Sequence, residues 1–135
     1  MYSRGEGVPQ DDAEAVKWYR LSADQGFAPA QNDLGTMYAS GRGVPKDASD
    51  AAKWFQLAAD RGFVPAQYNL AVMYETGHGM PQDDVQALKW LSLAVSRASI
   101  ADRDKVLMRG NALAAKMTPE QIAEAERLAR EWRPK

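Results

Sequence analysis

The chain is built on a tandem repeat, and this repeat constrains its fold more than any other feature. Residues 37–72 align with residues 1–36 without an insertion, and about half of the aligned positions are identical. Residues 73–96 align with residues 37–60 in the same register. A period of about this length is typical of solenoids, in which each unit is a small supersecondary structure that stacks on its neighbours.

Each copy of the repeat contains a Gly-x-Gly loop that leads into a helix. The loop recurs at residues 5–9, 41–45 and 77–81, where glycines permit positive φ and a proline prevents the preceding helix from resuming. An aspartate then occupies the position of a helix N-cap, and a polar residue stands three positions later, as in a capping box. These pairs are Asp11 with Glu14, Asp47 with Asp50, and Asp83 with Gln86.

A second type of helix is predicted at residues 29–40 and 65–76. It comes first in each full repeat as bounded below. Pro29 and Pro65 suit the first helical position, and apolar residues recur every fourth position after them. Gly35 and Ala71 are small, so the neighbouring helix can approach closely at these positions. Neither helix of a unit can bury its apolar face alone, so stacked neighbours must supply the core. We therefore predict an all-α solenoid of antiparallel helix pairs with right-handed superhelical stacking.

The pattern changes after Ser96, and the remaining residues are predicted to close the solenoid. Ser99 with Asp102 starts a helix that runs to about Lys116, and Thr118 with Gln121 caps a last helix. The buried stripe of this last helix is Ile122, Ala125, Leu128, Ala129 and Trp132, and its outer pairs are Glu126 with Arg130 and Arg127 with Glu131. The expected organisation is one domain with a partial repeat (1–26), two full repeats (27–62 and 63–98) and closing helices (99–135).

Composition limits the classes of function. The 135 residues carry a net charge of −1, so strong attraction to nucleic acid or anionic lipid is not expected. The absence of cysteine excludes disulfides and thiolate metal sites and leaves the redox compartment open. No apolar run approaches the roughly 18 residues of a membrane helix, so we expect no membrane insertion. The localisation stays open between the cytoplasm and the periplasm.

The combined repeat pattern resembles the Sel-1-like repeat, a relative of the tetratricopeptide repeat. Ala30, Leu34, Gly35, Tyr38, Gly41, Gly43 and Val44 carry its first half, and Asp47, Ala51, Trp54, Ala58 and Ala59 its second. The resemblance covers residues 1–98, and residues 118–132 look like the closing helices of bacterial members. It implies a non-catalytic adaptor that holds other proteins. One cysteine-rich bacterial branch is linked to β-lactam hydrolysis, and this chain lacks the paired cysteines of that branch.

Residues that could carry chemistry have simpler structural explanations. His78 is the sole histidine and lies in a loop where the other repeats have Glu6 and Arg42, so a solvent-facing turn residue is expected. Asp11 with Asp12 and Asp83 with Asp84 suit helix starts, where carboxylates meet the positive dipole end. Trp18, Trp54 and Trp90 share one register on an apolar stripe and are predicted to pack in the core. We predict no catalytic residue, no metal and no cofactor.

Binding residues are predicted by analogy with tetratricopeptide-like stacks, in which the first helix of each pair lines the concave face. The candidate groove residues are Asn32, Thr36, Ala39, Tyr68, Val72 and Glu75. The first choices for anchors are Tyr68 and Asn32, whose amide could bind a peptide backbone. The predicted function is protein or peptide binding through this face.

Two alternatives follow from the same residues. Met1 has the repeat position of Met37, so most of a first helix is missing and the apolar side of residues 13–25 is expected to be uncovered. Such a surface favours a self-associating structural module, a homodimer through the N-terminal edge. An envelope hydrolase is the other alternative, which a β-lactam turnover assay would test.

Overall fold

Helices account for the secondary structure of the chain. A computed structural model describes residues 9–135, and within this range there are seven helices and no strand. They are α1 (Pro9–Asp24), α2 (Ala28–Ser40), α3 (Ala48–Asp60), α4 (Val64–Thr76), α5 (Asp84–Arg97), α6 (Ile100–Ala114) and α7 (Pro119–Glu131).

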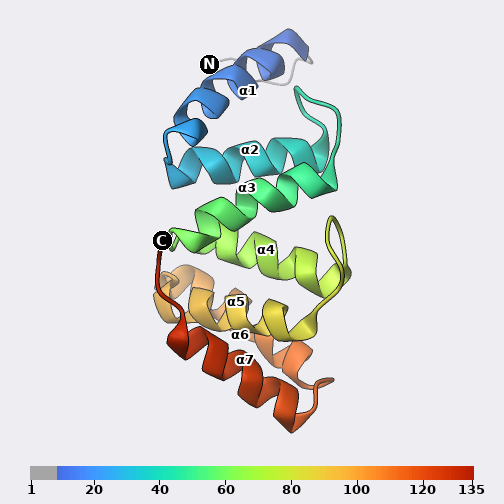
Figure 1. Ribbon diagram of the computed structural model, residues 1–135, viewed down its shortest axis with the longest axis vertical. Coiled ribbons are helices and arrows are strands. Elements are labelled where there is room, and N and C mark those ends of the chain that lie inside the picture. The colour runs from blue at the N-terminus through green and yellow to red at the C-terminus, as the bar shows by residue number, and fades with distance from the viewer. Residues whose placement is uncertain (1–8) are drawn as a thin grey trace.

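The helices stack along the long axis of the molecule, from α1 at one end to α7 at the other (Figure 1). Each of the first five helices packs on the next in chain order, and the tightest pairs are α2 with α3 and α4 with α5. The buried apolar residues form two clusters, a smaller one between α1 and α2 and a larger one from α3 to α7. The predicted all-α solenoid is confirmed.

The N-caps follow the predicted pattern in the two units that the structure describes completely. The Asp47 carboxylate accepts from the Asp50 backbone N–H, and Asp83 accepts from Gln86, each at 3.1 Å. The prediction for Asp11 is wrong, because α1 already begins at Pro9 and places Asp11 inside the helix. The loop at residues 5–8 lies outside the described residues, as do Met1 and Tyr2.

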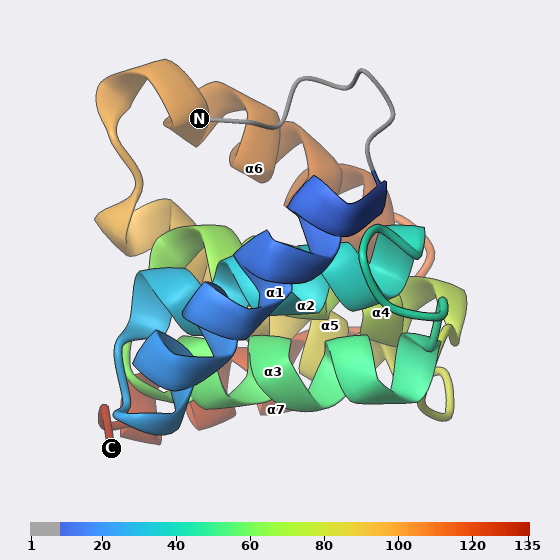
Figure 2. The same cartoon turned by 90° about the horizontal axis from the view of Figure 1, so that it is seen from above.

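The two helices after α5 do not form another regular pair. Both α6 and α7 pack on α5 and have little contact with one another, and Figure 2 shows them on opposite sides of the stack. Thr118 and Gln121 form the predicted capping box at the start of α7. α6 passes through Gly110 and ends at Ala114, two residues before the predicted end. Of the two expected ion pairs on α7, the one between Arg127 and Glu131 forms.

The three tryptophans of the repeat have different environments, although they share one register. Trp90 is 1% exposed, Trp54 is half-buried, and Trp18 is 65% exposed. The prediction of core packing is confirmed for Trp90 and wrong for Trp18. Trp54 packs on the core cluster between α1 and α2, and Trp90 also meets Trp132 of α7 edge-on, with ring centroids 6.0 Å apart. Among the described residues, Trp18 has no core cluster before it and no tryptophan facing it, because α1 is the first described helix.

Candidate protein-binding cleft

A cleft of about 570 Å³ runs between the first helices of two successive units, α2 and α4. Its floor includes Phe55 of α3, which is buried against Gly35 of α2. One end is bordered by the two Gly-x-Gly loop regions, which contribute Lys46 and His78, and α6 adds Arg109. The lining residues are Thr36, Ala39, Lys46, Ala48, Phe55, Tyr68, Asn69, Val72, Met73, Thr76, His78 and Arg109.

Four of the six residues predicted for the groove line this cleft. Thr36 and Ala39 come from α2, and Tyr68 and Val72 come from the equivalent turns of α4. They lie side by side because residues that are 36 apart in the sequence occupy the same position in adjacent units. The structure therefore brings these four residues together from two helices that α3 separates in the chain.

The other two predicted residues, Asn32 and Glu75, make internal polar contacts. The Asn69 side-chain amide donates to the Asn32 carbonyl oxygen at 3.1 Å. Glu75 accepts from Arg109 Nε at 3.0 Å and lies 3.9 Å from Lys116 Nζ. Both residues thus link every second helix of the chain. Asn32 links α2 to α4, and Glu75 links α4 to α6.

Tyr68 is held by two cations from α6. The Lys105 ammonium lies 4.8 Å from its ring centroid, and the Arg109 guanidinium carbon lies 5.9 Å away. Burial alone would lower the pKa of Arg109, but contacts with Tyr68 and Glu75 outweigh burial and raise it. Arg109 therefore stays charged, and its charge is fixed beside the ring by two partners.

The chain can now be compared with known proteins. The model of the Sel1 repeat matches residues 1–27, 28–63 and 64–99, which is most of the chain. This chain belongs to the Sel1 repeat family. Among curated proteins, no sequence matches. The match of the family model confirms the resemblance seen in the sequence.

Solved structures of Sel1 repeat proteins share the fold. The chain is similar to c5321, a protective antigen present in uropathogenic Escherichia coli strains that displays an SLR fold, with 32% identity and a TM-score of 0.86 over 94% of this chain. It spans only 27% of that protein. A Sel1 repeat protein from Oxalobacter formigenes is 40% identical with a TM-score of 0.66, and the match covers 76% of this chain and 77% of that one.

Sequence reasoning missed the cleft residues that come from the loops and from α6. Lys46 and His78 come from loops, and Arg109 comes from α6, where the repeat pattern fades. The register could still have extended the groove by one helix, because Met108 is 36 residues after Val72. Met108 is indeed largely exposed.

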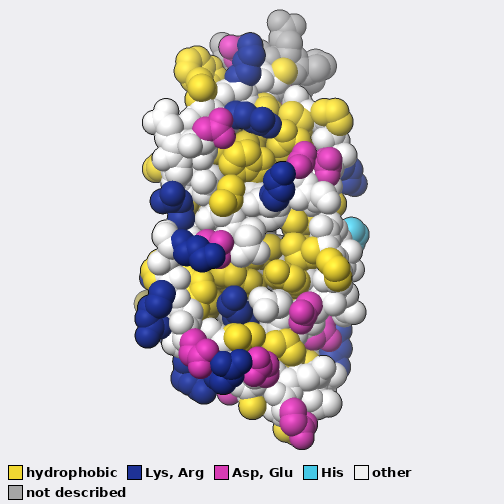
Figure 3. Space-filling view, viewed as in Figure 1, with side chains coloured by type: hydrophobic (Ala, Val, Ile, Leu, Met, Phe, Trp, Pro, Cys, Tyr) yellow, Lys and Arg dark blue, Asp and Glu magenta, His cyan; other side chains and the backbone are white. Residues whose placement is uncertain are grey.

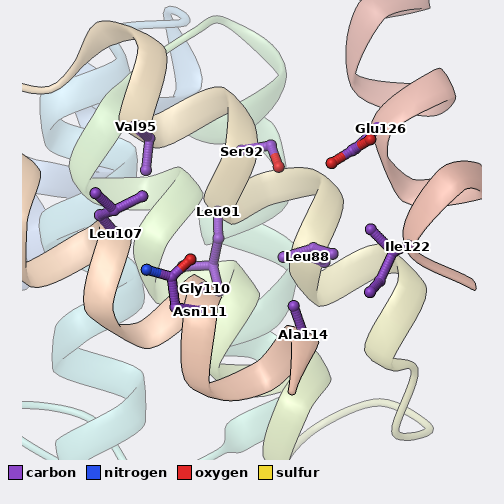
Figure 4. Close-up of a pocket in the computed structure, with 10 residues that line it drawn as sticks. All are labelled: Leu88, Leu91, Ser92, Val95, Leu107, Gly110, Asn111, Ala114, Ile122 and Glu126. Carbon is purple, nitrogen blue, oxygen red and sulfur yellow. The ribbon is translucent and has the colours of Figure 1, made fainter. Parts of the chain in front are cut away.

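A second, smaller cavity of about 270 Å³ lies between α5, α6 and α7. Figure 4 shows Ile122 and Glu126 of α7 directed toward Leu88 and Ser92 of α5. Leu107 of α6 also lines this space and occupies the repeat position of Gly35 and Ala71. A leucine at this position is too large for the close approach that glycine permits, and α7 lies away from α6.

The face of the molecule drawn in Figure 3 is chemically mixed. Figure 3 shows apolar patches with side chains of both charges among them. No helix within residues 9–135 is long and apolar enough to cross a membrane. The same range contains no group of three His, Asp or Glu side chains placed to hold a metal ion.

Proposed function

We propose that this chain is a non-catalytic scaffold that binds a peptide or an extended segment of another protein in the cleft between α2 and α4. Sel1 repeats generally mediate protein interactions, and their fold is typically non-enzymatic. The observation that carries the proposal is the convergence of Thr36, Ala39, Tyr68 and Val72 on one open, largely apolar cleft. Tyr68 supplies an aromatic anchor that two cations already hold in place, which lowers the entropy cost of binding.

Filling the cleft is expected to abolish binding without unfolding the protein. Val72 is half-buried and points into the cleft, so the indole of Val72→Trp would occupy the space of a ligand. We expect peptides selected on the wild-type protein from a displayed random library to bind this variant at least about tenfold more weakly. Fluorescence anisotropy with the synthesised peptides measures the change.

Ala123→Trp is the matched control, because Ala123 is exposed on α7 and does not line the cleft. Circular dichroism of both variants checks that they are folded. Selected peptides that bind Val72→Trp and wild type equally would show that binding occurs elsewhere.

Self-association is a second candidate, because large apolar side chains are exposed at the N-terminal edge. Trp18 is 65% exposed, Leu21 55% and Phe27 56%. Exposed apolar groups of this size, close together, favour a protein interface. A second copy of the chain could cover them.

Light scattering over a range of concentrations tests this candidate. We expect the mass to rise toward twice the 14.9 kDa of one chain, and Leu21→Asp to restore the monomer. Leu57→Asp is the control, since Leu57 has the same repeat position on α3 and is also exposed. A wild-type protein that stays monomeric at all concentrations would contradict self-association.

A further inference from the structure

We propose that the segment bound in the cleft between α2 and α4 is an extended peptide with acidic side chains. This inference rests on the proposed function and specifies its ligand. It follows from two properties of the lining, namely the sign of its charges and the kind of hydrogen-bonding groups that it offers.

The charged side chains that line the cleft are cationic. Lys46 and Arg109 contribute one positive charge each, and no Asp or Glu is among the lining residues. Lys46 makes no ion pair with a carboxylate in the described part of the chain. A carboxylate of a ligand would therefore find, at the loop end of the cleft, an ammonium that no carboxylate of the described residues pairs with.

The α6 side of the cleft also has an excess of positive charge. Lys105, Arg109 and Lys116 come from α6 and its C-terminal end, and Glu75 is the carboxylate that faces them. Glu75 is bonded to Arg109 and lies close to Lys116, while Lys105 lies over the face of Tyr68. Arg109 is the one of these cations that lines the cleft, and the acidic residues Asp33, Asp102 and Asp104 do not line it.

The uncharged polar groups of the lining present acceptors that suit peptide N–H groups. The Thr36 hydroxyl donates to the Asn32 backbone carbonyl at 3.1 Å, which leaves its oxygen lone pairs toward the cleft. The Asn69 amide nitrogen donates to Asn32, so its carbonyl oxygen remains to accept. Backbone N–H groups of an extended segment are donors of the required kind.

The same properties argue against a nucleic acid. A phosphate backbone is an acceptor throughout and is bound by several Lys or Arg side chains in a row. This cleft offers two cations together with acceptor oxygens, on a protein whose net charge is −1. The cleft also has room for a short extended segment, because its lining on α4 runs from Tyr68 to Thr76, a rise of about 12 Å, which an extended peptide spans with about four residues.

The test begins with phage-displayed random peptides of about twelve residues, selected on the wild-type protein at about 50 mM salt, where charge screening is weak. Peptides that no longer bind Val72→Trp are defined as cleft-dependent and are synthesised with a fluorescent label. Each is also made with Asp and Glu replaced by Asn and Gln. Affinities are measured for wild type, Lys46→Glu and the control Lys17→Glu, which makes the same charge change at an exposed position on α1.

We expect cleft-dependent peptides to be enriched in Asp and Glu. Lys46→Glu should weaken their binding about 3- to 10-fold, and Lys17→Glu less than about twofold. The amide versions should lose affinity for wild type and be insensitive to Lys46→Glu. Cleft-dependent peptides that are neutral or basic would overturn the acidic ligand while leaving the proposed function intact.

Two other outcomes are also decisive. If every selected peptide binds Val72→Trp as well as wild type, the proposed function fails and the acidic ligand fails with it. A labelled oligothymidine of about twelve nucleotides that binds more tightly than the peptides, and loses affinity in Lys46→Glu, would assign the cleft to nucleic acid.

Discussion

Replacing Trp90 with alanine is expected to reduce the free energy of unfolding by about 3–5 kcal/mol. The same substitution at Trp18 should cost less than about 1 kcal/mol, because a side chain that is mostly exposed loses little buried area. Trp90 is enclosed by the α3–α5 core on one side and by Trp132 of α7 on the other. Trp54→Ala should fall between the two, because Trp54 packs on the cluster between α1 and α2 and remains half-buried.

Urea unfolding followed by far-ultraviolet circular dichroism measures these three losses without relying on tryptophan fluorescence. Repeat proteins can unfold unit by unit, so hydrogen exchange should accompany it. In Trp90→Ala we expect amides of α5 and α7 to lose protection before those of α2 and α3. Equal losses at all three tryptophans would mean that the repeat position, and not the stacking neighbour, determines their contribution.

These tryptophans show how far a repeat pattern predicts structure. The pattern predicts the helices and the caps at Asp47 and Asp83, because these depend on residues close together in the sequence. It assigns Trp18, Trp54 and Trp90 the same environment, because their flanking residues are alike. Their burial depends instead on which helix stacks against them, and this differs from one unit to the next.

The cleft was predictable to the extent that it follows the repeat. Thr36 and Val72 occupy one register position, so placing them on neighbouring helices also places them side by side. The charges of Lys46 and Arg109 do not repeat, because the equivalent residues are Gln82 and Met73. Lys46 is a loop residue, and Arg109 extends from α6 across to Glu75 and Tyr68. The repeat therefore predicts where the cleft lies, while the tertiary contacts of α6 determine its charge.

The closing helices deviated from the simple pattern for a reason that can be read at one position. Gly35 and Ala71 are buried where α2 meets α3 and α4 meets α5. The equivalent residue of α6 is Leu107, which is partly exposed and lines the cavity between α5, α6 and α7. Small residues thus accompany tight helix pairs. Leu107 of α6 instead accompanies a following helix, α7, that packs on α5 and not on α6. Because α7 packs on α5, Trp132 covers Trp90.

If a small residue is required where α2 meets α3, alanine substitutions at Gly35 and at Gly110 should change the stability of the protein in opposite directions. Alanine is the better helix former at both, by up to about 1 kcal/mol. A Cβ atom on Gly35 would lie 2.7 Å from Phe55 Cε1 and 3.2 Å from the Ala51 carbonyl oxygen, so α3 or the Phe55 ring must move. Overpacking of this kind costs about 1–3 kcal/mol, and we expect Gly35→Ala to destabilise the protein by about 1–2 kcal/mol after the helix gain.

Gly110→Ala is the matched control, because its Cβ would meet only Leu88 and Leu91, each at 3.9 Å, which is ordinary van der Waals contact. It should stabilise the protein by about 0.5–1 kcal/mol. Urea midpoints of the two variants, with unchanged denaturant slopes, measure both effects. If Gly35→Ala were stabilising like Gly110→Ala, close approach at Gly35 would not be what holds α2 and α3 together. The different packing of α6 and α7 would then need a cause other than Leu107.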